Sequence, residues 1–118
     1  MTDATSRNEL APPGGGRMDK IRQMLASQPD DAFLVYSLAM EMAALGRVDE
    51  ALAQFARTLE LDAQNVPACT EAGKLLRSAG RLAEARAMFQ RGLDLAGQLG
   101  QSHQADYLRQ QLEALPEK

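Results

Sequence analysis

The sequence contains few side chains whose types and spacing would allow catalysis or metal binding. The strongest candidates are Cys69 and His103. They are the single cysteine and the single histidine of the chain, and a thiolate nucleophile needs a histidine base held beside it. Cys69 falls on the predicted inward face of a helix, whereas His103 falls in the loop or first turn before the last helix. We therefore predict a buried, inert thiol and a surface imidazole. One cysteine and one histidine also cannot complete a closed zinc site.

Two further patterns resemble catalytic or phosphate-binding features. Glu50 and Glu84 recur at equivalent positions, but each lies in the first turn of a predicted helix, where the helix dipole favours a negative charge. The run Gly14–Gly16 is followed by Arg17 and Met18, not by the Lys-Ser or Lys-Thr pair of a phosphate-binding loop. The remaining acidic residues show no calcium-loop spacing. The sequence thus predicts no enzyme activity, no metal and no cofactor.

Two stretches of the chain repeat at a spacing of 34 residues, and the other elements are organised around them. They run from Gly46 to Leu61 and from Gly80 to Leu95 and share nine identical positions, where composition alone predicts about one. The identical pairs are Gly46/Gly80, Arg47/Arg81, Glu50/Glu84, Ala51/Ala85, Ala53/Ala87, Phe55/Phe89, Arg57/Arg91, Leu59/Leu93 and Leu61/Leu95. A fixed period of this length predicts stacked helical units, each burying its apolar face against its neighbours.

The period divides the chain into a tail and one helical domain. Polar residues, prolines and glycines predict that residues 1–16 form a disordered linker. The domain is predicted at 17–118, with a half repeat at 17–30, full repeats at 31–64 and 65–99, and a capping helix at 102–115. We expect about six helices in an all-α, right-handed solenoid of antiparallel pairs.

Apolar residues at helical spacing mark the inward faces of these helices. The expected inward residues are Met18, Ile21, Met24 and Leu25, then Leu34, Val35, Leu38, Ala39, Met42 and Leu45, then Cys69, Ala72, Gly73 and Leu76, and finally Ala105, Leu108, Leu112 and Leu115. The third group is smaller than the second, which lets its helices lie closer or leaves room for a neighbour. The expected helix caps are Asp30 or Asp31, Asn65 and Ser102 at the start, and Gly46 and Gly80 at the end.

These residues resemble the tetratricopeptide repeat family, whose 34-residue unit pairs two antiparallel helices with the pattern W-x2-L-G-x2-Y, then A-x3-F, then P. The matching residues are Leu38, Ala39, Gly46, Ala51 and Phe55 in the first unit and Gly73, Gly80, Ala85 and Phe89 in the second. The aromatic positions of the leading helix, the first of each pair, hold other residues, and the family proline is Ala63 or Gly97.

The resemblance implies a non-catalytic protein–protein interaction module whose leading helices line a concave groove for a peptide. Mapped onto this sequence, the groove residues are Phe33, Tyr36, Ser37, Met40, Thr70, Glu71, Lys74 and Arg77. One half is apolar with a tyrosine hydroxyl and the other is mostly basic, so a segment with an apolar anchor and an acidic group would fit. Such a module would act as an adaptor or assembly factor. Alternatively, these side chains only cover the N-terminal helix or lie in solvent.

Charge narrows the class of partner. A net charge of -3 opposes nucleic-acid binding, and no apolar run reaches the length of a membrane helix. A lone cysteine and no secretory signal pattern predict a cytoplasmic protein.

Residues 32–65 carry five acidic and two basic residues, whereas residues 66–99 carry five basic and three acidic residues. Self-association of a structural or scaffold domain, through these charges or through the apolar groove, is therefore the alternative function.

Overall fold

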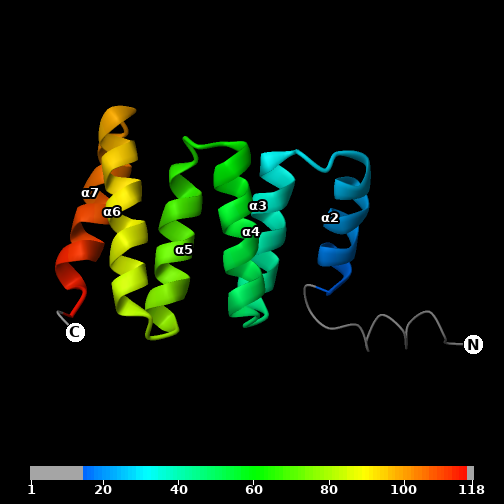
Figure 1. The fold of residues 1–118 in the computed structure, drawn as a ribbon, viewed down its shortest axis with the longest axis horizontal. Helices are drawn as coiled ribbons and strands as arrows, with labels where there is room; N and C mark the ends of the chain where they lie inside the picture. The colour runs from blue at the N-terminus through cyan, green and yellow to red at the C-terminus, as the bar shows by residue number, and fades with distance from the viewer. Residues whose placement is uncertain (1–14, 117–118) are drawn as a thin grey trace, which may run out of the picture.

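The computed structural model describes residues 15–116, and over this range the chain forms six α-helices and no β-strand. The helices are α2 (Gly15–Ser27), α3 (Ala32–Ala44), α4 (Val48–Leu61), α5 (Val66–Ser78), α6 (Leu82–Gln98) and α7 (Ser102–Ala114). They follow one another in a row, in chain order, along the longest axis of the molecule, and short connections join them (Figure 1). The all-α helical-repeat architecture predicted from the sequence period is confirmed.

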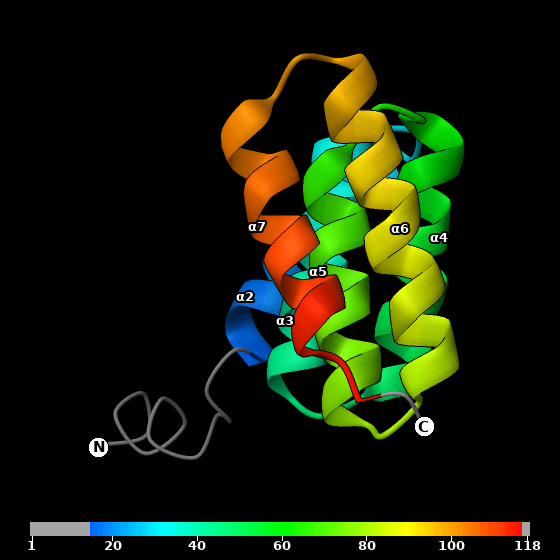
Figure 2. The ribbon, with the colours of Figure 1, turned by 90° about the vertical axis from the view of Figure 1, so that its left-hand side faces the viewer.

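The helices form two layers. Leading helices α3, α5 and α7 lie on one side of the row, and α4 and α6 lie on the other (Figure 2). Each leading helix packs on its partner, as α3 on α4 and α5 on α6, and the α4–α5 and α6–α7 contacts join successive pairs. Helix α2 packs against α3 and lies on the side of α3, α5 and α7 in the view of Figure 2.

The predicted linker, residues 1–16, lies outside the described residues except for its last two. Gly15 and Gly16 are the first residues of α2, so their assignment to the linker is corrected. Glycine costs about 1 kcal/mol relative to alanine inside a helix, but burial of Met18 and Ile21 holds this helix against α3. None of the helices formed by residues 15–116 is long and apolar enough to cross a membrane.

Most of the predicted helix caps are formed. The Asp31 carboxylate accepts a hydrogen bond from the Leu34 amide, and the Asn65 side chain accepts one from the Ala68 amide. Gly46 and Gly80 end α3 and α5 with φ angles of 76° and 78°, a left-handed backbone that residues with a Cβ adopt only with strain. The prediction for α7 is wrong, because its N-cap is Gln101 without a side-chain bond.

Two apolar clusters form the core, with Phe55 at the centre of one and Phe89 at the centre of the other. The inward residues of the repeat signature are all buried, namely Leu38, Ala39, Ala51, Phe55, Gly73, Ala85 and Phe89. A Cβ on Gly73 would lie 2.6 Å from the Phe89 ring, so the glycine lets this ring pack directly against the backbone of α5.

Two residues predicted to face inward are exposed. Leu45 is 39% exposed because it is the C-cap of α3 and lies beyond the last turn. Met24 is 46% exposed, although the residues one and two repeats later, Thr58 and Gly92, are buried. In the described part of the chain, α2 has no leading helix of its own to cover this position.

Candidate functional site

The predicted groove residues come from α3 and α5, and two adjacent hollows open on the face formed by α3, α5 and α7, which we call the leading-helix face. Four of the predicted residues line these hollows, namely Met40, Thr70, Glu71 and Lys74, whereas Phe33, Tyr36, Ser37 and Arg77 line neither. The first hollow has a volume of about 270 Å³ and is lined by residues that include Met40, Ala43, Glu71, Lys74 and Leu75. The second hollow, of about 290 Å³, is lined by Pro67, Thr70, Glu71, His103, Gln104 and Tyr107. Because Glu71 lines both, the hollows follow one another across α3, α5 and α7.

The apolar half of the predicted site lies on α3. Tyr36 packs edge-on against Phe55, with ring centroids 5.9 Å apart and an angle of 64° between the rings. Burial, followed by the negative charge of Glu71, raises the pKa of the Tyr36 hydroxyl, so this hydroxyl is neutral at physiological pH and can donate a hydrogen bond. Met40 is half-buried at the wall of the first hollow, whereas Phe33 is 72% exposed.

The serine and threonine hydroxyl groups of the site are engaged within their own helices. Ser37 Oγ donates to the Phe33 carbonyl oxygen at 2.9 Å, and Thr70 Oγ1 donates to the Val66 carbonyl oxygen at 3.2 Å. These bonds occupy the hydroxyl protons, which leaves the oxygens as acceptors toward a ligand.

Lys74 and Glu71 form the charged centre of the face. Their Nζ and Oε2 atoms lie 3.5 Å apart, and both side chains remain partly exposed. Ion pairs this open contribute little to stability. A carboxylate on a ligand can therefore compete with Glu71 for the Lys74 ammonium group.

Arg77 is held by the fold, although it was predicted to be a groove residue. Its guanidinium lies 5.7 Å from the centre of the Phe89 ring, and Nη1 donates to Gln111 Oε1 of α7. The arginine thus ties α7 to α5. This contact between α5 and α7 depends on the position of α7, which the 34-residue period does not predict.

Comparisons with known proteins decide the family. The tetratricopeptide repeat profile matches residues 42–112, which is more than half of the chain. The chain belongs to the tetratricopeptide repeat family. No curated protein matches it.

Solved structures with the same fold include other tetratricopeptide repeat proteins. A tetratricopeptide repeat domain protein from Salinibacter ruber is 27% identical, with 76% of this chain and 94% of that chain covered and a TM-score of 0.69. The type III secretion translocator chaperone SycD from Yersinia enterocolitica is 16% identical, with 96% and 85% covered and a TM-score of 0.80. YrrB, a tetratricopeptide repeat protein with an unusual peptide-binding site, is 21% identical, with 82% and 57% covered and a TM-score of 0.59.

The residues that α7 contributes to the second hollow, His103, Gln104 and Tyr107, were not predicted from the sequence. Helix α7 was expected only as a cap, because it leaves the register of the tetratricopeptide repeat. The signal was present, since α7 continues the pattern after an insertion of two residues. Tyr107 lies 36 residues after Glu71, and His103 lies 36 residues after Pro67. Helix α7 therefore acts as a third leading helix.

The repeated Gly-Arg-x-x-Glu motif of the two tetratricopeptide units has a structural use. Nε and Nη2 of Arg47 donate to the two carboxylate oxygens of Glu50, and the same two nitrogens of Arg81 donate to Glu84. Arg81 also bonds Asp49 of the preceding unit. Hydrogen bonds from the arginines lower the pKa of both glutamate carboxyls. These two-bond pairs explain the recurring glutamates more fully than the helix dipole does.

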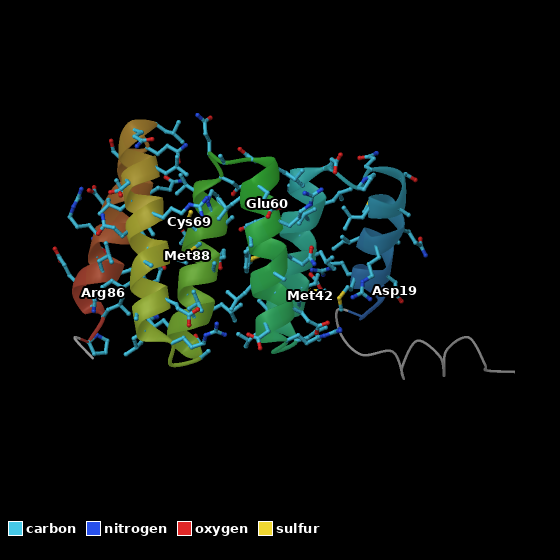
Figure 3. The ribbon with its side chains drawn as sticks, in the orientation of Figure 1. Asp19, Met42, Glu60, Cys69, Arg86 and Met88 are labelled. Carbon is cyan, nitrogen blue, oxygen red and sulfur yellow. The ribbon has the colours of Figure 1, made fainter. Side chains whose placement is uncertain are left out.

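Cys69 lies at the contact of α5 and α6, where Figure 3 labels it, and it is fully buried as predicted. Burial raises the pKa of its thiol, and the positive charge of Arg91 opposes this only in part, so the thiol stays protonated and unreactive. Among residues 15–116, no group of three His, Cys, Asp or Glu side chains could hold a metal ion.

Proposed function

We propose that this chain is a protein–protein interaction module whose leading-helix face binds a segment of another protein. The observation that carries the proposal is the pair of adjacent hollows, because together they join side chains of α3, α5 and α7. The names of two proteins of the same fold agree with it, since one is a chaperone and the other has a peptide-binding site. The module serves as an adaptor or assembly factor without chemistry of its own.

The lining of the hollows specifies the ligand. Met40, Ala43 and Leu75 give the first hollow an apolar wall for an aliphatic or aromatic anchor. An acidic group of the same segment reaches Lys74, where it replaces the loose contact with Glu71. The segment then continues over the second hollow, where His103 and Tyr107 offer an imidazole and a half-exposed ring.

The test is a capture experiment with a matched charge change. The full chain, a Lys74→Glu variant and a Lys20→Glu variant are used to capture proteins from a lysate of the native source. Lys20 is exposed on α2, away from both hollows. We expect a protein captured by the wild type and by Lys20→Glu to be lost from Lys74→Glu. A photo-crosslinking residue at position 40 should attach to that protein, and one at position 26 should not.

Equal capture by all three chains would remove the leading-helix face as the binding site. It would do so only if circular dichroism and thermal melting show that Lys74→Glu is folded like the wild type. We expect this variant to stay folded, because the Lys74–Glu71 pair is partly exposed and long and the new repulsion between the two glutamates costs only about 0.5 kcal/mol.

Self-association is the second candidate, and two exposed apolar side chains favour it. Phe33 and Met24 are 72% and 46% exposed, on the adjacent helices α3 and α2. SycD, which shares the fold, is described as a dimer. If this patch pairs two copies, light scattering at high protein concentration should show a dimer that Phe33→Ser abolishes. A monomer under those conditions would exclude this candidate.

A further inference from the structure

A second elongated depression lies on the opposite side of the row, between α4 and α6, and we call it the back furrow. One part has a volume of about 290 Å³ and is lined by residues that include Leu52, Leu59, Ala72 and Met88. The other part, of about 530 Å³, runs on along α6 toward Gln98. Both parts share Ala87 and Arg91, so the furrow is continuous. Its lining shares only Phe55 with the two hollows of the leading-helix face.

The back furrow exists because the second unit has smaller side chains than the first. Ala72 lies in its floor, and Leu38 occupies the equivalent position one repeat earlier. Leu38 is buried in the same cluster as Met18 and Ile21 of α2. With only a methyl group at position 72, the space above α5 between α4 and α6 is not filled. These two helices do not pack closely on each other.

The furrow has an apolar floor, and the charged side chain that its two parts share is Arg91. Leu52 and Met88 are half-buried along the furrow, and Figure 3 labels Met88 between α5 and α6, just below Cys69. Arg91 lines both parts, yet none of the ion pairs between residues 15 and 116 includes it. Glu84 is held by Arg81, whereas Asp94 also lies outside these ion pairs and accepts a hydrogen bond from the neutral Gln90. The furrow therefore presents a cation without a partner beside an apolar surface.

The form of the furrow selects a helical ligand. In the part lined by Leu52, Leu59 and Met88, an extended segment would leave backbone N–H and C=O groups facing aliphatic side chains, which is costly, whereas an α-helix bonds these groups internally. The furrow follows α6 from Glu84 to Gln98, about 21 Å at the rise of an α-helix. We propose that the back furrow binds an amphipathic α-helix of another protein, with an apolar stripe against Leu52, Leu59 and Met88 and a carboxylate against Arg91.

The experiment titrates synthetic helical peptides into the isotope-labelled full chain and follows backbone amide signals by NMR. The probe is about 15 residues long, with leucines at i, i+3, i+4, i+7 and i+11 and one glutamate beside the middle of this stripe. One control peptide has lysine in place of that glutamate, and another has the same composition with alternating leucines. We expect the glutamate probe to shift signals of α4 and α6 and to bind about tenfold more tightly than either control.

Two substitutions locate the site. Arg91→Glu should weaken the glutamate probe about tenfold and reverse the preference, so that the lysine peptide binds better. Ala72→Leu restores the leucine of the first unit, fills the floor and should weaken both peptides about tenfold or more. Lys74→Glu makes the same change of charge on the leading-helix face and should leave peptide affinity unchanged. Because Arg91 is exposed, its variant remains informative even if Ala72→Leu unfolds.

Several results would overturn the proposal. They are signal shifts confined to α3, α5 and α7, equal affinity for the glutamate and lysine peptides, or no shift at all. Loss of a wild-type dimer in Arg91→Glu, with no peptide bound, would assign the furrow to a second copy of the chain. Failure of Lys74→Glu to affect capture concerns only the leading-helix face and leaves the furrow proposal standing.

Discussion

The two repeat units use the same pattern with different volumes. In the pair α3–α4, Leu38 and Ala39 are buried in the same cluster as Phe55. In the pair α5–α6, Ala72 and Gly73 take the equivalent sequence positions, and Gly73 lies against Phe89. The smaller pair has two effects. Gly73 brings the Phe89 ring against the helix backbone, and Ala72 leaves the back furrow open. The period therefore fixes which positions face inward, whereas the side-chain volumes decide where the stack is closed and where it can accept a ligand.

The largest expected effect is on the central rings. Phe55→Ala and Phe89→Ala should each lower the free energy of unfolding by about 3–5 kcal/mol, because both rings are almost completely buried. We expect the larger loss at Phe89, where Gly73 has no side chain to move into the cavity. Urea denaturation of both variants measures the difference. Equal losses would show that the second unit relaxes as readily as the first.

Gly73→Ala tests the close contact in the second unit. Alanine favours a helix by about 1 kcal/mol relative to glycine, yet a Cβ here would lie 2.6 Å from the Phe89 ring. We expect a net loss of about 1–3 kcal/mol in thermal or urea unfolding. The matched control is Gly97→Ala on α6, where nothing lies within 4 Å of the new Cβ, and this variant should be stabilised. A gain in both variants would contradict the contact.

A second substitution sharpens the same test. Phe89→Leu removes the ring edge that a Cβ at position 73 would meet, so the double variant Gly73→Ala/Phe89→Leu should lose less than the sum of the two single losses. Independent, additive losses would mean that the two positions do not interact.

The smallest effect concerns the arginine–glutamate pairs, which are alike in the two units. The pKa of the Glu50 and Glu84 carboxyls is lowered in the folded chain. Their contribution to stability is therefore complete above the unfolded pKa of about 4.3 and is lost as the pH falls through the folded pKa. Glu50→Gln and Glu84→Gln should each flatten the decline of the melting temperature below about pH 4.5. The exposed Asp19→Asn serves as the control, and an unchanged slope in the glutamine variants would contradict the prediction.

The sequence predicts the fold well because helix periodicity and repeat spacing are local signals. The 34-residue period alone assigns Leu38, Ala51, Phe55 and their counterparts to the core. Each turn after a leading helix is predicted from a single glycine, Gly46 or Gly80. The exceptions have particular causes. Met24 is exposed because the described part of the chain places no leading helix in front of α2, and Gly15 is helical because α2 is held by its packing on α3.

The surfaces were harder to predict because they depend on contacts between units. The sequence identified Met40, Glu71 and Lys74 as neighbours on one face, and they line one hollow. The hydrogen bond from Arg77 to Gln111 could not be predicted from the sequence, since it depends on how α6 positions α7. The back furrow was even harder to predict from the sequence, because it results from the small side chain of Ala72 and not from a residue with distinctive chemistry.

Leu52 and Met88 pack against both core clusters, and this shared position bears on how the molecule opens. Units of a linear array unfold together only to the extent that their interface couples them. The clusters around Phe55 and Phe89 meet at the floor of the back furrow, so this seam is where the two halves can separate, and native-state hydrogen exchange should resolve them as two protection classes. A helix bound in the furrow would touch both halves at once and would merge the two classes into one cooperative unit.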